Sequence, residues 1–216
     1  MLSHRLKSLG DWLESCDTLA DIGSDHAYLP IYLLKNDKIQ QALIIEINEK
    51  PLKKAIDMTI KEKVNEQCRF FLSNGLREVN VLASTYVLAG MGSETILDII
   101  HQDINTFRKA NQIVIQSNSK WSFLRKKMHQ LGFNLLDEKL ILDRKKEYLF
   151  LKYKYAKVEN YTSQELNLGP YLMKQGTLEF INSLKSKVKS YSTVQNFLDE
   201  DKKEWLKHAQ EYLSTK

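Results

Sequence analysis

The alternation of short apolar runs with longer segments of helical periodicity constrains the fold of this chain most strongly. From residue 18 to about residue 157, five strand-like runs are separated by segments long enough for crossover helices, and two further runs follow. The predicted strands are 18–22, 41–47, 68–73, 85–90, 112–117, 135–143 and 147–155, and the predicted helices are 27–36, 49–65, 93–109 and 120–131. Because parallel strands need such crossovers, the first five runs predict a parallel α/β sheet.

The last two predicted strands are joined only by the short polar turn "RKK" (144–146). So short a connection predicts an antiparallel hairpin at the edge of the sheet. A mostly parallel sheet of seven strands with an antiparallel edge hairpin is typical of the Rossmann-like class I methyltransferase fold. It differs from the all-parallel sheet of nicotinamide-binding domains.

The chain changes character after the last predicted strand. Residues 156–170 are polar and end in Gly-Pro, which predicts a linker. Apolar residues then recur at helical spacing, at Ile181, Leu184, Val188 and Tyr191 and at Leu198, Trp205 and Tyr212. They predict two antiparallel helices that form a short α-helical coiled-coil hairpin. We expect the basic segment 185–190 and the acidic segment 199–201 to pair across it. The expected domains are residues 1–157 and residues 158–216.

Composition excludes several classes of protein. With 216 residues and 43% hydrophobic content, the chain can bury a core. No apolar run approaches the roughly 20 residues that cross a bilayer, and the amphipathic start lacks a secretory signal, so we expect a cytoplasmic protein without a membrane partner. The two cysteines show no metal-ligand spacing, so we expect no metal. The net charge of +5 suits a polyanionic partner, although many lysine-rich proteins bind no nucleic acid.

The turn after the first predicted strand, "DIGSDHAYLP" (21–30), resembles a nucleotide-binding turn without its phosphate-binding glycines. Of the pattern G-x-G-x-x-G only Gly23 remains, and a pyrophosphate would meet Asp25. S-adenosylmethionine carries an ammonium and a sulfonium and has no phosphate, so acids near the turn are tolerable or helpful. The turn therefore predicts S-adenosylmethionine as the cofactor and argues against a nicotinamide oxidoreductase.

Residues after the second and third predicted strands are further candidates for cofactor contacts. Glu46, followed by Ile47, stands where an acid accepts both ribose hydroxyls in such folds, although a solvated strand-end acid is the alternative. Asn74 and Gly75 follow the third strand, where the adenine edge would lie. A plain Asn-Gly turn is the alternative there.

The segment "LAGMGSE" (88–94) follows the fourth predicted strand, where methyltransferases keep the loop between cofactor and acceptor. Its glycines permit close approach of the backbone to a flat base. The expected cofactor contacts are Ala89, Gly90 and Met91, and the expected substrate contacts are Met91 and Gly92. The alternatives are an ordinary strand-to-helix turn and a Met91 side chain that only packs.

The segments "ADIGSDHAYLP", "LAGMGS" and "LGPYLMK", with the C-terminal hairpin, resemble the bacterial tRNA (adenine-22-N1)-methyltransferase family, called TrmK. The resemblance covers essentially the whole chain. It implies transfer of a methyl group from S-adenosylmethionine to N1 of adenine 22 in tRNA. It places functional positions at Asp21, Gly23, Asp25, His26 and Tyr28 in the first motif, and at residues 89–92 in the second.

Within this resemblance, three side chains are the expected catalytic residues. Asp25 would stabilise the positive charge that develops on the methylated base and accept a proton from N6, whereas helix capping is its alternative role. His26 would hold the acceptor or orient Asp25, or it is a neutral packing residue. Tyr28 would stack on a base, or it only contacts the core.

A tRNA partner needs phosphate contacts, for which basic segments are the candidates. Arg5 and Lys7, with residues 124–130 and 143–148, are the expected contacts, although charge runs on surface helices are usually only solvated. The hairpin would extend the footprint on tRNA, or it is structural or dimerising; we expect a monomer. A methyltransferase acting on another RNA site or a small molecule, and a noncatalytic tRNA-binding protein, remain as alternatives.

Overall fold

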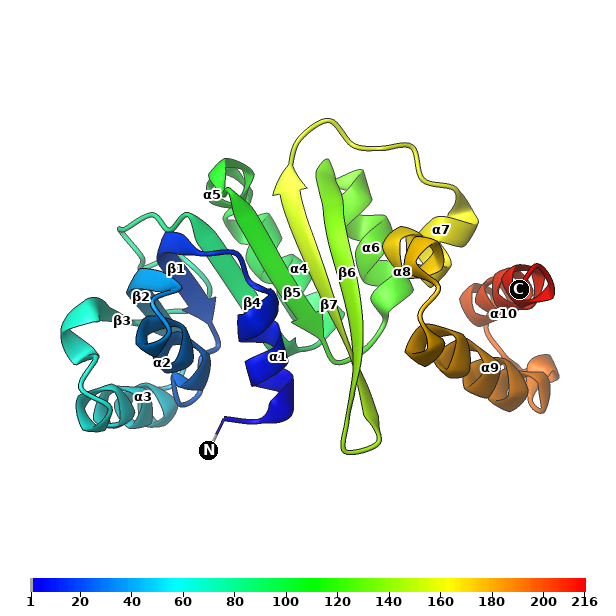
Figure 1. The fold of residues 1–216 in the computed structure, drawn as a ribbon. Coiled ribbons are helices and arrows are strands. Elements are labelled where there is room, and N and C mark those ends of the chain that lie inside the picture. Colours follow the sequence, from blue (N-terminus) through cyan, green and yellow to red (C-terminus); the bar gives the residue numbers. More distant parts are fainter. Residues whose placement is uncertain (1) are drawn as a thin grey trace.

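The structure, a computed structural model, describes residues 2–216 and contains one seven-stranded sheet (Figure 1). The strand order is β3-β2-β1-β4-β5-β7-β6. The strands are β1 (Cys16–Ile22), β2 (Ile39–Glu46), β3 (Cys68–Leu72), β4 (Thr85–Met91), β5 (Gln112–Ser117), β6 (Phe133–Asp143) and β7 (Lys146–Tyr155). The first five pair in parallel, whereas β7 is antiparallel to both β5 and β6. The predicted class I methyltransferase fold is confirmed.

Helices cover both faces of the sheet because its strands are apolar on both sides. The helices are α1 (His4–Trp12), α2 (Tyr28–Lys35), α3 (Glu49–Lys61), α4 (Ser93–Gln102), α5 (Ile104–Lys109), α6 (Trp121–Gln130), α7 (Ser163–Leu168), α8 (Pro170–Gln175), α9 (Leu178–Ser192) and α10 (Glu200–Ser214). In Figure 1, α1, α2 and α3 lie on the near face and α4, α5 and α6 on the far face. A hydrophobic core lies on each face of the sheet, and successive strand residues point to alternate faces. Val87 belongs to the core shared with α1, α2 and α3, and Leu88 belongs to the core shared with α4, α5 and α6.

Two predicted helices differ from the observed ones. The predicted helix 93–109 is interrupted at Asp103, between α4 and α5. The carboxylate of Asp103 accepts a hydrogen bond from the backbone N–H of Leu76, 3.3 Å away in the loop after β3. This contact between distant segments has no signal in the local sequence.

The predicted helix 49–65 ends at Lys61, and Lys63 has a positive φ of 60°.

The sheet places the carboxyl ends of β1, β2, β3, β4 and β5 at one edge, because these strands run in parallel. β1 lies between β2 and β4, so the order reverses there, and ligands bind at such a point in open α/β sheets. β6 runs in the same direction as β5, since both oppose β7. The turn between β6 and β7 therefore lies at this same edge (Figure 1).

The predicted linker 156–170 is wrong for its second half, which contains α7. Thr162 accepts a hydrogen bond from the N–H of Glu165, whose side chain accepts one from the N–H of Thr162. This reciprocal pair is a capping box, which the sequence "TSQE" encodes and the prediction missed. Leu168 is buried in the core beneath α6, so the polar composition of the segment conceals a helix with one buried face.

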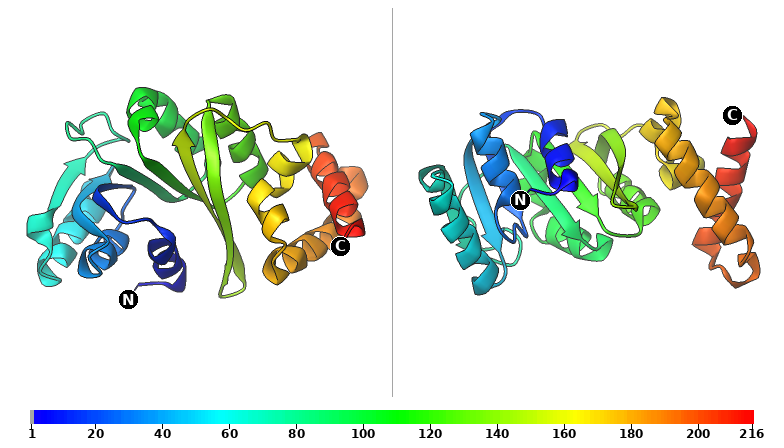
Figure 2. Two further views of the ribbon diagram at one scale, coloured as in Figure 1. Left: turned by 45° about the horizontal axis from the view of Figure 1, so that its top comes forward. Right: turned by 60° about the horizontal axis from the view of Figure 1, so that its bottom comes forward.

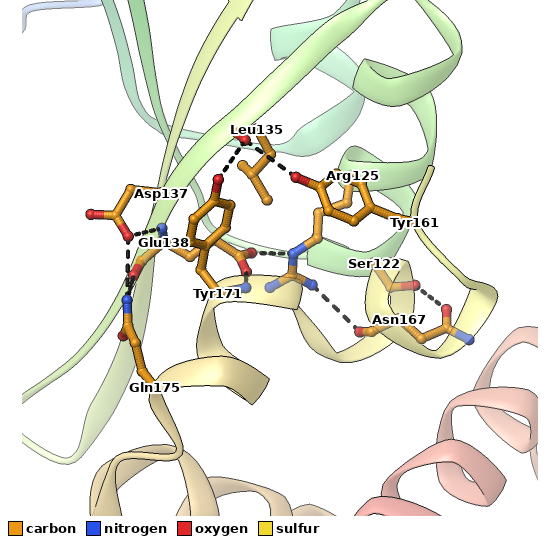
Figure 3. A network of polar contacts seen from close by, with 9 residues as sticks. All are labelled: Ser122, Arg125, Leu135, Asp137, Glu138, Tyr161, Asn167, Tyr171 and Gln175. Atoms are coloured by element: carbon orange, nitrogen blue, oxygen red, sulfur yellow. Dashed lines mark hydrogen bonds and ion pairs between the residues drawn. The ribbon is translucent and has the colours of Figure 1, made fainter. Parts of the chain in front are cut away.

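A buried ion pair connects the sheet to the C-terminal helices (Figure 3). Arg125 of α6 and Glu138 of β6 form this pair, and their side chains are at most 3% exposed. The second carboxylate oxygen of Glu138 accepts the backbone N–H of Tyr171 at 3.2 Å, and Arg125 donates to the carbonyl of Asn167 at 3.4 Å. A Cβ at Gly169, whose φ is 107°, would lie 2.7 Å from both charged groups. Only glycine fits there.

The C-terminal helices α9 and α10 contact each other, and both views of Figure 2 place them at the opposite end of the molecule from α3. Tyr191 and Trp205 pack edge to face with ring centroids 5.5 Å apart. The expected charge pairing across this hairpin is wrong: Lys187 pairs with Glu147 of β7. Within residues 2–216, segment 199–201 pairs only with lysines of its own helix, because short i,i+3 contacts are available there.

Candidate active site

The turn after β1 is tight and left-handed at several residues. Gly23, Asp25 and Ala27 have φ values of 77°, 46° and 55°. The N–H of Gly23 donates to the carbonyl of Ile45 at 2.9 Å, which fastens the turn to β2. Ala27 is the residue at the N-cap of α2, and no side chain caps that helix. Helix capping by Asp25, the alternative role considered from sequence, is therefore wrong.

Glu46 lies at the end of β2 and is buried, with 6% of its surface exposed. Its carboxylate accepts a hydrogen bond from the backbone N–H of Asp25. The solvated strand-end acid considered as an alternative is therefore wrong. Burial of an ionisable side chain costs free energy unless polar partners compensate it, and the turn after β1 supplies one such partner.

Asp21 places a second carboxyl group beneath the same turn. It is 5% exposed and accepts a hydrogen bond from the hydroxyl of Ser24 at 2.5 Å. Burial and, to a smaller extent, the nearby charge of Glu46 raise the pKa of Asp21 to about 6, against the opposing effect of the Ser24 hydrogen bond. Two buried carboxyl groups at one turn disfavour a phosphate and favour a cationic ligand. This charge preference is the one expected for an S-adenosylmethionine site.

The three predicted catalytic side chains are adjacent in space. The Asp25 side chain is 72% exposed, and one of its carboxylate oxygens lies 2.9 Å from Nδ1 of His26. That nitrogen is enclosed but is not aligned for a hydrogen bond with any of residues 2–216. The rings of His26 and Tyr28 stack with centroids 5.3 Å apart and planes within 7°. The arrangement is a row of carboxylate, imidazole and phenol, with the carboxylate toward solvent.

The loop after β4 meets the turn after β1. A Cβ at Gly23 would overlap the terminal methyl of Met91, so the Met91 side chain lies directly over that glycine. Gly90 has a φ of 85°, while Gly92 precedes α4 and has open space beside it. Ala89 is half-buried. The predicted acceptor loop is therefore beside the predicted cofactor turn.

The remaining predicted cofactor residues occupy the same edge of the sheet. Ile47 is 58% exposed directly after β2. Asn74 is exposed after β3, and Gly75, with a φ of 69°, packs beside Ile99 of α4. Asn74 lies at a bend and Gly75 begins the turn that follows it, and the exposed Asn74 side chain is accessible to a ligand.

Arg5 reaches this edge from α1. Its guanidinium donates to the side chain of Gln116, at the end of β5, and lies 5.5 Å from the ring of Tyr148. The same group is 3.9 Å from where a Cβ on Gly90 would stand. Arg5 therefore adjoins the predicted acceptor loop.

Some predicted phosphate contacts are engaged elsewhere. Arg125 is buried in its pair with Glu138 and cannot reach a phosphate, so the expectation for that residue is wrong. Lys126 pairs with Glu204, and Lys7 pairs with Asp11. A charge run in the sequence does not reveal which of its members have partners in distant elements.

Two residues of the site were missed from sequence. The side chain of Asn118 donates to the carbonyl of Gly90 at 2.7 Å, and its backbone N–H donates to the carbonyl of Met91 at 2.8 Å. Gln116 accepts from Arg5. Both belong to "QSNS" (116–119), a polar run that ends a fully buried strand, which is the signal that would have found them.

Comparison with known proteins identifies the family of this chain. The model of the family described as tRNA (adenine(22)-N(1))-methyltransferase, TrmK, matches residues 19–216. The chain belongs to the TrmK family. The resemblance seen in the sequence is thereby confirmed.

Members and relatives of the TrmK family resemble two thirds or more of the chain. A tRNA (adenine(22)-N(1))-methyltransferase of Bacillus subtilis is 28% identical over 148 residues, which are 68% of this chain but 62% of that protein. A candidate tRNA (m1A22) methyltransferase of Streptococcus pneumoniae, crystallised with S-adenosyl-L-methionine, has a TM-score of 0.88 at 25% identity, covering 99% and 100% of the two chains. M. capricolum TrmK with S-adenosyl-homocysteine has a TM-score of 0.85 at 27% identity, covering 99% and 98%.

Two further features concern metals and membranes. Within residues 2–216, no three His, Cys, Asp or Glu side chains are grouped so that they could hold a metal ion. In the same part of the chain, no helix has the length and apolar character needed to span a bilayer.

Proposed function

We propose that this chain transfers a methyl group from S-adenosylmethionine to N1 of adenine 22 in tRNA. The observation that carries the proposal is the hydrogen bond between Glu46 and the N–H of Asp25. It joins the acid suited to a ribose, at the end of β2, to the turn that presents the carboxylate suited to a methylated base. Membership of the TrmK family supports the same reaction, partner and site.

The cofactor site comprises the residues at the carboxyl ends of four neighbouring strands. S-adenosylmethionine, when bound, supplies a methyl group on a positively charged sulfur. Glu46 accepts the ribose hydroxyls, while Asp21 favours the positive charge of the ligand from beneath the turn. The other proposed contacts are Gly23, Asp25, Ile47, Asn74, Gly75, Ala89, Gly90 and Met91.

The acceptor side contains the proposed catalytic residues. N1 of adenine has an in-plane lone pair, so positioning of the base is the main requirement and no strong base is obligatory. The exposed carboxylate of Asp25 faces the base, stabilises its developing positive charge and accepts a proton from N6. His26 positions that carboxylate by close contact, with Nδ1 2.9 Å from a carboxylate oxygen, and Tyr28 supports the imidazole by stacking and presents its ring to a base.

The substrate imposes further roles on the chain. Adenine N1 is engaged in a Watson–Crick pair, so the target base must be unpaired or extruded into the site. Met91 and Gly92 line the acceptor side with Arg5. We assign catalysis to residues 1–157 and tRNA contacts outside the target site to residues 158–216, in a cytoplasmic monomer.

Methyl transfer to two matched transcripts tests the proposal. Labelled S-adenosylmethionine is supplied with an unmodified tRNA transcript that has adenine at position 22, and with the same transcript carrying guanine there. Label only in the first establishes reaction, partner and site together. Label in both contradicts the site, and label in neither contradicts the substrate.

A further inference from the structure

A hollow of about 610 Å³ lies between the start of α1 and the turn that joins β6 to β7. Its walls are residues 2–5 on one side, and Asp143, Arg144, Lys146 and Tyr148 on the other. The turn itself is a two-residue hairpin in which Arg144 and Lys145 have φ values of 49° and 68°. This α1–turn hollow has a volume typical of a site for a small ligand or a nucleotide.

The α1–turn hollow is strongly basic. Arg5, Arg144 and Lys146 line it, and within residues 2–216 none of the three forms an ion pair. Asp143 is its one lining carboxylate, and it accepts the backbone N–H of Arg5 at 3.1 Å, at the first turn of α1. The hollow therefore has uncompensated positive charge, which attracts an anion.

Tyr148 positions two of these cations. The guanidinium of Arg5 lies 5.5 Å from the centroid of its ring, and the ammonium of Lys146 lies 5.2 Å from it. Cation–π contacts of this length hold the side chains in place without neutralising their charge. The two cations thus remain directed at the hollow and available to an anionic ligand.

Arg5 also connects the hollow to the acceptor loop. Its guanidinium binds the side chain of Gln116 and stands 3.9 Å from the position of a Cβ on Gly90. A base that enters the acceptor site remains covalently attached to its own two phosphates. One of those phosphates must lie within a nucleotide's length of the acceptor loop, where the hollow presents its cations.

We propose that the α1–turn hollow binds the RNA phosphate next to the target adenosine. Arg144 and Lys146 contact the phosphate oxygens, and Arg5 links this contact to the loop at Gly90. The assignment rests on the proposed function, since it takes tRNA as the substrate. By holding the RNA backbone at this phosphate, the hollow would set the position of the target base in the acceptor site without contacting the base itself.

Neutral variants of the turn test the proposal. Arg144→Gln with Lys146→Gln removes two charges from exposed side chains while the backbone is kept. Lys154→Gln is the matched control, because Lys154 is exposed at the other end of β7, about 27 Å away at 3.4 Å per residue. We expect the double variant to raise the Kd for tRNA about tenfold and to leave the affinity for S-adenosylmethionine unchanged. We also expect the salt slope, which is the slope of the logarithm of the tRNA binding constant against the logarithm of the salt concentration, to fall in magnitude by about one to two. A salt slope equal to that of the control overturns the proposal.

A modified transcript tests the position of the phosphate. An uncharged methylphosphonate linkage is placed on the 5′ side of adenosine 22, or on its 3′ side. For the wild-type protein we expect one linkage to weaken tRNA binding, and for the double variant we expect that linkage to add no further loss. Additive losses, or no effect of either linkage on the wild type, overturn the assignment. Failure of the wild type to methylate the unmodified transcript would instead contradict the proposed function. The phosphate assignment is tested by binding and the proposed function by methylation, so the failure of one can be distinguished from the failure of the other.

Discussion

The carboxylate of Glu46, at the end of β2, accepts the backbone N–H of Asp25, which precedes it by 21 residues. One buried acid thereby holds the turn that presents the exposed Asp25 carboxylate. The proposed ribose contact and the orientation of this turn therefore involve the same side chain. Substitutions at Glu46 and at Asp25 should separate these two contributions.

Replacing Glu46 should weaken cofactor binding. Glu46→Ala removes both the proposed ribose acceptor and the partner of the Asp25 N–H, and a lost hydrogen bond to a charged group costs about 1.5–3 kcal/mol. We expect the Kd for S-adenosylmethionine to rise about 10- to 100-fold, measured by calorimetry. Glu46→Gln keeps an acceptor oxygen for the N–H and should lose less. Equal affinity for all three proteins would contradict the ribose contact.

Asp25→Asn should reduce turnover while leaving tRNA bound. Asparagine tolerates the left-handed backbone at this position, where φ is 46°, so the turn is preserved and only the charge is removed. We expect kcat for tRNA methylation to fall at least about tenfold, with the Kd for tRNA within a factor of about three. An unchanged kcat would show that the carboxylate has no catalytic role.

Asp21 should make stability depend on pH. Its pKa of about 6 in the folded protein exceeds its ordinary value of 3.8, so the folded state binds the proton more tightly than the unfolded chain. The stabilisation from this group is full below pH 3.8 and is lost as the pH rises through 6, a change of about 3 kcal/mol. Urea unfolding between pH 4 and pH 7 measures it. Asp21→Asn lacks the titration, and parallel curves for the two proteins would refute the prediction.

Breaking the buried pair of Arg125 and Glu138 should destabilise the fold. Arg125→Met leaves Glu138 buried without its cation, whose loss typically costs about 3–5 kcal/mol. Arg125→Met with Glu138→Leu should recover part of that free energy, because no charge then remains buried. Lys126→Met is the control on the same helix, since its pair with Glu204 is partly exposed and worth at most about 1 kcal/mol. Equal losses for Arg125→Met and the control would exclude this role for the buried pair.

The order of the elements and the chemistry of the first motif could be predicted from sequence, because both are local. Apolar periodicity identifies strands and helices one segment at a time, and the short "RKK" turn permits only an antiparallel connection. The missing glycines after Gly23 and the charge of Asp25 argue against a phosphate, and both can be seen within a few neighbouring residues. The resemblance of the quoted segments to the motifs of the family also sufficed to indicate that family.

Contacts between distant segments were decided only by the tertiary structure. The break at Asp103 depends on the N–H of Leu76, and the role of Arg125 depends on Glu138, a residue of the neighbouring element β6. The α1–turn hollow brings together Arg5 and Lys146, which are 141 positions apart in the chain and both lie beside the ring of Tyr148. Local sequence determines which conformation a segment prefers. Which side chains become partners depends on packing, because burial and pairing are properties of the folded chain as a whole.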